Sequence, residues 1–462
     1  MSFFSLVDNP LVNIWITIIF CTTILLLFVV KRLLIKANNN SKQKSKTTSK
    51  VKNQTQTQGQ RKEAKVKDTT TKTKKKLTDN QRFRADKQAF SHSWLLTSFK
   101  GHTGEILDID FSSNGKYLAS CSEDRTVLVW YMDDLNSVKK DHKSFRINIE
   151  YDHGIFIKWS PDTKAFIIQK AIENCIEVYK VEKKKDSGAL STAKKVLTFP
   201  KTTDDDLCGF GIANSGRFIM TCTITNNMTI WDLRGNILAQ LETYLMTTHR
   251  AKVSPCGKFV AACGFAPDCK IWEVVFNKSG EFQQIKRAFE LSGHTSGIFD
   301  VAFTADSSHI ATVSKDGTWK VYNINVEYNK GEDPHLIITG HYENQGGSTR
   351  LALSPNAEVL VIATYNTLLF FDVTTGELDN EINDIFADNI TQLLFDPTGK
   401  YVLVSGDKHI RTFHNITGYR TEIRTAENKL KQHQTSATKE RLENLIEQNK
   451  VVLDKHGETY DD

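Results

Sequence analysis

Seven short runs of β-branched and other apolar residues, each ending in an aromatic residue, recur along most of the chain. Their closing tripeptides are LVW, EVY, TIW, KIW, KVY, LFF and RTF, which end at Trp130, Tyr179, Trp231, Trp272, Tyr322, Phe371 and Phe413. Consecutive aromatic residues lie 41 to 52 residues apart. Runs of this kind favour β-strands, and self-similarity at this period indicates an array of like units rather than a single mixed domain.

A second pattern precedes these runs and divides each unit into more strands. Turn residues separate two hydrophobic segments in FSSNGKYLA, WSPDTKAFI, IANSGRFIM, VSPCGKFVA, FTADSSHIA, LSPNAEVLV and FDPTGKYVL. Units of about 40–50 residues with room for four short strands resemble WD40 repeats, whose architecture is a β-propeller. We therefore expect an all-β, seven-bladed propeller over residues 91–420. Residues 93–99, SWLLTSF, are expected to supply the outer strand that the last unit lacks and to close the ring.

Two polar quartets occupy matching positions in the first and fifth units. The spacing from His to Asp is 22 residues in both, and the spacing from His to the aromatic residue is 28. The residues are His102, Ser120, Asp124 and Trp130, and His294, Thr312, Asp316 and Tyr322. Ser, His and Asp also form hydrolytic triads, but a catalytic set would occur once, whereas a buried hydrogen-bond network can recur. We interpret both quartets as structural tetrads and expect no catalytic, cofactor-binding or metal-binding residue.

The apolar segment LVNIWITIIFCTTILLLFVV, residues 11–30, indicates a membrane anchor within residues 1–36. Twenty residues at about 1.5 Å rise span roughly 30 Å, the thickness of a hydrocarbon core. The segment lacks the basic start and the small-residue cleavage site of a signal peptide, so we expect it to stay uncleaved. Lys31, Arg32 and Lys36 follow directly, which predicts a luminal N-terminus and a cytosolic propeller.

A basic linker, residues 37–90, separates this anchor from the repeats. Between Lys31 and Lys87 there are 19 Lys and Arg residues against four acidic ones, a net charge of +15, which leaves −9 for the rest of the chain. The linker is almost free of apolar residues, so we expect it to be disordered. Two interpretations remain open: an extended spacer that repels itself, or a segment that contacts anionic lipid or RNA.

After residue 420 the sequence becomes polar, with apolar residues at helical spacing. Leu442, Leu445, Ile446, Val452 and Leu453 fall roughly on one face. We expect a helical tail over residues 421–462. It could dock on the propeller, pair with another chain or fray.

Longer stretches resemble one particular family. They include FSSNGKYLASCSEDRTVLVW (111–130), VSPCGKFVAACGFAPDCKIWEV (253–274) and SKDGTWKVYNINVEY (314–328), which are similar to the transducin beta-like protein 2 family. The resemblance implies a protein of the endoplasmic reticulum membrane with a cytosolic propeller. It also implies an adaptor in the unfolded protein response and in translation control, with an endoplasmic reticulum stress kinase and RNA or ribosomal components as partners. The family has no catalytic residues.

These observations predict a non-enzymatic, membrane-tethered scaffold that binds proteins through the propeller rim. Two alternatives stay open: an RNA- or ribosome-binding protein that acts through the basic linker, and a membrane-anchored exchange factor for a small GTPase. A hydrolase is disfavoured, because the sequence has no P-loop, nucleophile elbow or clustered metal ligands.

Overall fold

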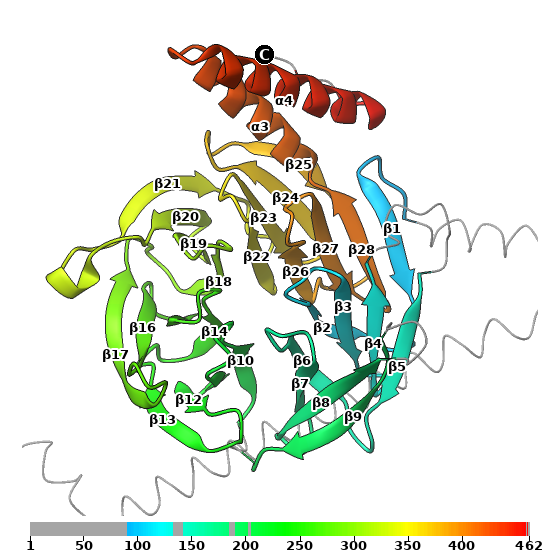
Figure 1. The fold of residues 1–462 in the computed structure, drawn as a ribbon, viewed down its shortest axis with the longest axis vertical. Coiled ribbons are helices and arrows are strands. Elements are labelled where there is room, and N and C mark those ends of the chain that lie inside the picture. Colours follow the sequence, from blue (N-terminus) through cyan, green and yellow to red (C-terminus); the bar gives the residue numbers. More distant parts are fainter. Residues whose placement is uncertain (1–89, 133–141, 184–189, 202–204, 459, 461–462) are drawn as a thin grey trace, which may run out of the picture. The chain divides into compact units, whose positions relative to one another are not determined.

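A computed structural model describes residues 90–132, 142–183, 190–201, 205–458 and 460 of the 462-residue chain. All of them belong to one compact unit, Gln81–Asp462. Strands dominate this unit and follow one another around a common centre (Figure 1). The described secondary structure also contains two α-helices and a short 3₁₀-helix, η2 (Tyr328–Lys330). The repeats therefore build the all-β, propeller-like fold that their pattern predicts.

The strands form up-and-down meanders of four. These are β2–β5 (Ile106–Phe111, Tyr117–Ser122, Thr126–Tyr131, Ser144–Asn148), β6–β9 (Gly154–Trp159, Ala165–Lys170, Ile176–Lys183, Leu190–Thr198), β10–β13 (Leu207–Ile212, Ile219–Thr223, Asn227–Trp231, Ile237–Glu242), β14–β17 (Thr248–Val253, Phe259–Gly264, Cys269–Phe276, Phe282–Leu291), β18–β21 (Ile298–Phe303, His309–Ser314, Thr318–Asn323, His335–His341), β22–β25 (Thr349–Leu353, Val359–Thr364, Thr367–Asp372, Leu378–Ile382), and β26–β28 (Gln392–Phe395, Tyr401–Gly406, His409–His414) together with β1 (Leu95–Lys100). The first strand of each meander lies nearest the centre (Figure 1).

The N-terminal strand completes the last meander, as the sequence predicts. β1 pairs antiparallel with β28, from Leu95 opposite Phe413 to Lys100 opposite His409. The resulting sheet has the order β1-β28-β27-β26, so its outer strand comes from the start of the repeats and its other three from the end. This pairing removes the free edge that β28 would otherwise present to solvent or to another chain.

Five sheets have four strands, whereas the meanders β10–β13 and β14–β17 are joined into one sheet of eight. The junction is a single parallel bridge between Gly209 on β10 and Ala251 on β14. Small side chains explain the close approach, because a Cβ on Gly209 would lie only 2.5 Å from the Ala251 Cβ. Two inner strands therefore come together where neither has a bulky side chain.

All seven aromatic residues that mark the repeats lie on the third strand of a meander, and each is buried. The core consists of layers between consecutive sheets. One layer, for example, combines Phe99 of β1, Ile106 of β2, Trp130 of β4 and Leu403 of β27. Burial of each such side chain contributes about 1.5–3 kcal/mol, so stability comes mainly from contacts between sheets.

The tail consists of two helices, α3 (Ile416–Leu430) and α4 (Ser436–Lys455), that pack against each other and against the last sheets. α3 begins five residues before the expected tail boundary, because the Asn415 side chain caps it by accepting a hydrogen bond from the Gly418 amide. Ile423 of α3 and Leu453 of α4 are buried in the same core layer as Trp94 and Phe413. In the structure the tail is therefore docked on the propeller.

Among the described residues, no helix is long and apolar enough to cross a membrane. The anchor expected at residues 11–30 and the linker expected at residues 37–90 lie outside the described residues, apart from Phe90. Both therefore stay predictions from the sequence.

Trp94 should be a large contributor to stability, because it joins the closing strand to both the last sheets and the tail. It is fully buried, its ring centroid lies 5.1 Å from that of Phe370, and its Nε1 donates to Glu458 at 2.7 Å. We expect Trp94→Ala to lower the free energy of unfolding by roughly 3–5 kcal/mol. Guanidinium denaturation of the full-length chain in detergent measures this, with the exposed Tyr151→Ala as control. A loss below 1 kcal/mol would contradict the assigned role of Trp94.

Candidate functional site

The four members of the first quartet lie together within one sheet. The His102 Nε2 is 2.8 Å from the Ser120 Oγ, and its Nδ1 is 3.1 Å from the Asp124 Oδ2. The Trp130 Nε1 donates to the Ser120 Oγ at 3.0 Å. A carboxylate can only accept, so we assign the His102 ring proton to Nδ1, and Nε2 then accepts from the Ser120 hydroxyl. Burial lowers the pKa of His102, which keeps the ring neutral at pH 7.

This connectivity is that of a hydrolytic triad, but the hydroxyl cannot reach a substrate. Ser120 is fully buried and His102 is 6% exposed. The Ser120 oxygen also accepts the Trp130 hydrogen bond, so its surroundings are occupied by protein atoms. A nucleophile needs an exposed face toward the reacting carbonyl, which is missing here. The role that the quartet can fill is structural: it provides hydrogen-bond partners for buried polar groups and fixes the register of neighbouring strands.

Asp124 holds the loop that carries His102. Its carboxylate accepts hydrogen bonds from the Thr103 amide at 2.8 Å and from the Thr126 hydroxyl at 2.6 Å, in addition to the His102 ring. Burial alone would raise the pKa of Asp124, but these hydrogen bonds and the nearby imidazole lower it to about 2. The carboxylate is therefore ionised at all physiological pH values.

The second quartet repeats the polar part of the first and differs at the aromatic residue. The His294 Nε2 is 2.9 Å from the Thr312 Oγ1, and its Nδ1 is 3.1 Å from the Asp316 Oδ2. The Tyr322 hydroxyl donates to the Ser292 backbone oxygen at 2.7 Å, whereas Trp130 donates to Ser120. Both His residues thus sit in equivalent networks.

Units without the His and Asp keep part of the pattern or replace it. In the third unit, the Trp231 Nε1 donates to the Thr221 Oγ1 at 3.0 Å, which is the Trp–hydroxyl half of a quartet. In the second unit, the Tyr179 hydroxyl donates to the Glu177 Oε2 at 2.7 Å. The spacing rule from the first and fifth units could not find these pairs, because it relies on the His.

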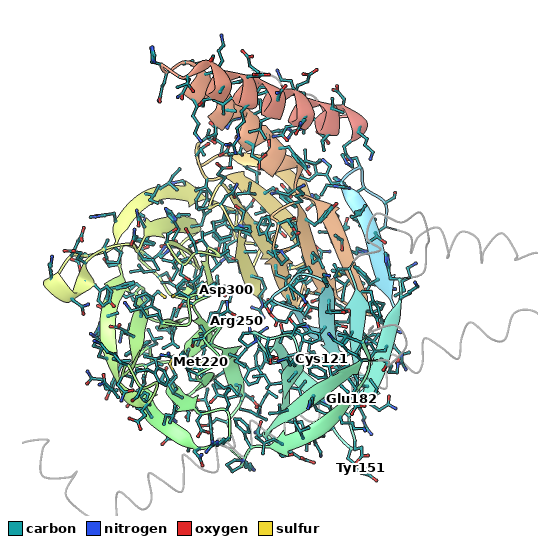
Figure 2. All side chains as sticks on the ribbon, in the orientation of Figure 1. Cys121, Tyr151, Glu182, Met220, Arg250 and Asp300 are labelled. Atoms are coloured by element: carbon teal, nitrogen blue, oxygen red, sulfur yellow. The ribbon has the colours of Figure 1, made fainter. Side chains whose placement is uncertain are left out.

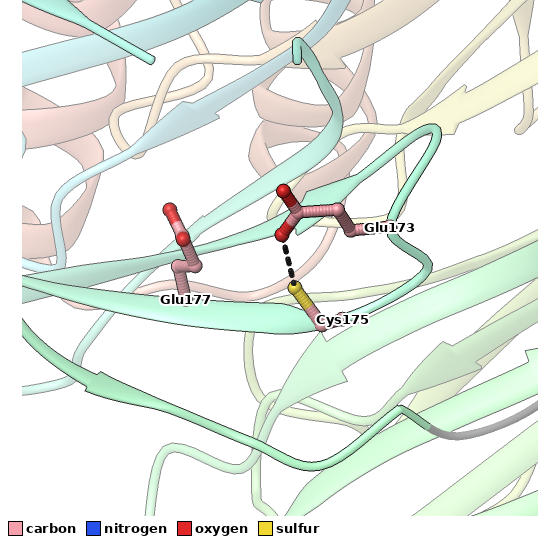
Figure 3. Close-up of side chains that lie close together, drawn as sticks. All are labelled: Glu173, Cys175 and Glu177. Atoms are coloured by element: carbon pink, nitrogen blue, oxygen red, sulfur yellow. Dashed lines mark hydrogen bonds between the residues drawn. The ribbon is translucent and has the colours of Figure 1, made fainter. Parts of the chain in front are cut away.

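Glu173, Cys175 and Glu177 in the second unit bring ligand-type atoms within 4.8 Å of one another (Figure 3). The Lys170 Nζ lies 2.8 Å from the Glu173 Oε2 and 3.6 Å from the Glu177 Oε1, and the Lys195 Nζ lies 3.1 Å from the Glu177 Oε1. Two ammonium groups therefore already balance the charge of the two carboxylates. Burial raises the pKa of Cys175 to about 11, which keeps the thiol protonated, whereas a metal ligand must be a thiolate. The cluster therefore fits an internal ion pair better than a metal site.

The loops of the ring divide into two sets, one at each end of the strands. Because neighbouring strands are antiparallel, the loop before each first strand and the loop between each second and third strand lie at the same end; Ile106, for example, is opposite Ser122. We call this end the top face. Its described loops are residues 101–105, 123–125, 149–153, 171–175, 199–201, 205–206, 224–226, 243–247, 265–268, 292–297, 315–317, 342–348, 365–366, 383–391 and 407–408.

The top face is strongly acidic. Its described loops carry 14 Asp and Glu residues against four Lys and Arg, a net charge of −10. The described turns at the opposite end carry 10 acidic and nine basic residues. Burial and the charges of Glu123, Asp388 and Asp407 raise the pKa of Glu105, as expected where carboxylates crowd together. A field of this sign attracts cationic partners to one end only.

Large apolar side chains project from the same face. Met246 is 75% exposed, Tyr244 70%, Phe265 59% and Ile224 40%. Backbone hydrogen bonds join their loops, from the Phe265 amide to the Thr247 oxygen and from the Thr248 amide to the Ile224 oxygen. We call these four residues, Ile224, Tyr244, Met246 and Phe265, the apolar loop patch.

The backbone of this patch is strained. Tyr244 and Met246 have φ values of 52° and 65°, in the left-handed region, which costs roughly 1–2 kcal/mol for a residue with a side chain. Tyr151 and Tyr365, also exposed on the top face, have φ values of 59° and 53°. Aromatic side chains held exposed at such positions have no role in the core. The sequence pattern does not reveal these exposed residues, because apolar residues at strand ends look like core positions.

Comparisons with known proteins agree with the fold. The chain matches the family model described as WD domain, G-beta repeat, over residues 93–131 and 285–323, the segments that contain the quartets. It is similar to human Transducin beta-like protein 2, with 41% identity over 388 residues, which cover 83% of this chain and 86% of the human protein. The mouse Transducin beta-like protein 2 is 40% identical over 387 residues, 83% and 87% of the two chains. The WD repeat-containing protein WDS homolog of Arabidopsis thaliana is 24% identical over 287 residues, 52% of this chain and 50% of that protein.

The quartet should stabilise the fold in a pH-dependent way. We expect Asp124→Asn to lower the free energy of unfolding by roughly 1–3 kcal/mol near pH 7, because buried donors lose an ionised acceptor. The pKa of Asp124 in the folded chain, about 2, lies below its ordinary value of 3.8. Its stabilisation is therefore complete above about pH 5 and is lost progressively as the pH falls through the folded-state pKa, to about pH 1.

Denaturant unfolding of the full-length chain in detergent at pH 7, 4 and 2.5 measures this effect. The difference between the wild type and Asp124→Asn should narrow at the lowest pH. The exposed Asp333→Asn serves as control. A difference that is absent at pH 7, or that grows on acidification, would show that Asp124 does not anchor the network.

Proposed function

Because the chain belongs to the transducin beta-like protein 2 family, we propose that it is a non-catalytic WD40 scaffold. In this proposal the chain is tethered to the cytosolic face of the endoplasmic reticulum membrane and binds proteins through its top face. The observation that carries the proposal is the combination, at one end only among the described loops, of strongly acidic loops with exposed aromatic and Met side chains.

The ring in this proposal has seven blades. The eight-stranded sheet counts as two of them, because a single bridge between Gly209 and Ala251 joins two meanders that are otherwise equivalent to the rest. β1 belongs to the seventh blade by its pairing with β28. Loops from all seven blades then contribute to the top face.

The partner that fits this face is a basic segment with apolar side chains. The net charge of −10 favours approach of a Lys- or Arg-rich chain and accelerates encounter. Tyr and Met in the apolar loop patch supply the large, adaptable contacts that usually dominate binding energy. Strain at Tyr244 and Met246 is consistent with side chains held in position for a partner.

Residues 11–30 are proposed to be the tether, with Lys31, Arg32 and Lys36 on the cytosolic side. Confinement to the membrane raises the local concentration of partners that are already there, so weak contacts suffice. By resemblance to its family, the chain acts in the unfolded protein response and in translation control, and an endoplasmic reticulum stress kinase is one partner.

A second candidate function is RNA or ribosome binding through the basic linker. The net charge of +15 between Lys31 and Lys87 favours it. This function would not need the top face.

A double variant of the apolar loop patch, Tyr244→Ser with Met246→Ser, tests the scaffold proposal. Carbodiimide cross-linking of the full-length protein in endoplasmic reticulum membranes joins carboxylates to partner lysines, and mass spectrometry maps them. We expect links to concentrate on top-face carboxylates and to fall at least fivefold in the double variant, since each central contact contributes about 1–2 kcal/mol. Leu336→Ser with Ile337→Ser, at two apolar side chains on β21 that are 50% and 51% exposed, is the control.

Other cross-linking outcomes oppose the proposal. Links on the opposite turns would place binding elsewhere, and links only to residues 37–87 would show that the chain's own linker occupies the top face. RNA association that survives the double variant but disappears without residues 37–82 would favour the second candidate.

The proposed topology makes a separate prediction. Protease added to sealed endoplasmic reticulum vesicles should digest an epitope after residue 462 and spare one before residue 1. Removal of residues 1–36 should release the chain from the membrane. Protection of the C-terminal epitope, or retention of the truncated chain, would refute the tether.

A further inference from the structure

The first strands of the sheets surround a cavity of about 510 Å³ at the centre of the ring. Its lining includes the turns between first and second strands, such as Ser112, Ser160 and Pro255, so it opens at the end opposite the top face. Its charged lining residues are Asp110, Lys158, Arg250 and Lys252. Figure 2 shows Arg250 and Asp300 toward the centre of the ring.

The two lysines of this cavity have carboxylate partners. The Lys158 Nζ lies 2.9 Å from the Asp108 Oδ2 and 3.6 Å from the Asp110 Oδ1. The Lys252 Nζ lies 2.9 Å from the Asp300 Oδ1. Each lysine ammonium group therefore lies within ion-pair distance of a carboxylate.

Arg250 has no such partner in the part of the chain that the structure describes. It is only 9% exposed, its Nε is buried without a hydrogen bond, and no described residue accepts a hydrogen bond from its guanidinium. It shares β14 with Lys252, two residues away and on the same side of the strand. Three cations, Arg250, Lys252 and Arg350, act on the single carboxylate of Asp300.

The neighbouring groups respond to this excess of positive charge. Burial, and then the charge of Arg250, lower the pKa of Arg350 to about 9. Burial and Arg250 likewise lower the pKa of Lys252, although Asp300 opposes the shift. An arginine stays protonated inside proteins, and an unpaired buried charge costs several kcal/mol. The fold thus maintains an unfavourable arrangement that an anion in the cavity would relieve.

We propose that the central cavity binds a small molecule through an oxyanion group, a phosphate or a carboxylate, with the Arg250 guanidinium as the principal ligand and Lys252 as the second cation. A guanidinium presents parallel N–H donors that match either group in a bidentate manner. The cavity opens away from the top face, so an anion entering it does not pass the −10 charge of those loops. This site is independent of the protein-binding surface proposed above.

Titration calorimetry of the full-length chain in a nonionic detergent and a low-salt Tris buffer tests the proposal. The probes are inorganic phosphate and, in a second arm, acetate. We expect saturable one-to-one binding of phosphate that Arg250→Met weakens at least tenfold. Arg234→Gln, at an exposed arginine in the turn after β12, should bind as the wild type does. Binding of acetate with similar affinity would show that a carboxylate group is enough for binding at this site. Binding of phosphate but not acetate would restrict the ligand to phosphoryl compounds.

Stability measurements keep the test decisive if a variant folds poorly. Because no described residue pairs with the Arg250 guanidinium, Arg250→Met should unfold in phosphate-free buffer at the same temperature as the wild type or a higher one. Phosphate should raise the unfolding temperature of the wild type but not of the variant. A variant that is clearly less stable without phosphate, a wild type that binds neither probe, or undiminished binding by Arg250→Met would overturn the proposal.

Discussion

The pairing of β1 with β28 determines whether these sheets form a ring or an open stack. Five residue pairs, from Leu95 with Phe413 to Lys100 with His409, cover the edge of the last sheet with a strand from the start of the repeats. The tail stabilises the same closure between β1 and β28. Glu458 beyond α4 accepts a hydrogen bond from Trp94, and Arg420 of α3 forms ion pairs with both Asp379 and Glu458. The core layers between sheets depend on this closure, because each needs a neighbour on both sides.

The closed ring separates two kinds of electrostatic environment. Its top face carries most of the acidic loops and the exposed, strained side chains of the apolar loop patch. Its interior instead contains an excess of guanidinium and ammonium groups around Asp300. Since the inner strands carry the cations and the loops carry the acidic residues, the central cavity and the top face can differ in charge without any change in the sheets themselves.

Sequence patterns predicted the architecture well because strand alternation and turn chemistry are local. All seven marker aromatic residues lie on third strands, and residues 93–99 largely coincide with β1. α3 begins at Ile416, before the tail expected from residue 421, because the cap at Asn415 lies directly after β28 and leaves no linker between strand and helix. The functional surfaces depend on non-local facts: Met246 is exposed through a left-handed backbone, and whether Arg250 finds a partner among the described residues depends on side chains distant in sequence.

The pairing of β1 with β28 also affects how the chain folds during its synthesis on the ribosome. Phe99 and Ile410, which are paired in the finished ring, lie 311 residues apart. At roughly 5–20 residues per second, a ribosome needs on the order of tens of seconds to synthesise the segment between them. During that interval the first strand has no partner and the nascent sheets have an open edge. Chaperones that shield unpaired strands during synthesis would therefore matter more for this chain than for a repeat array whose units close locally.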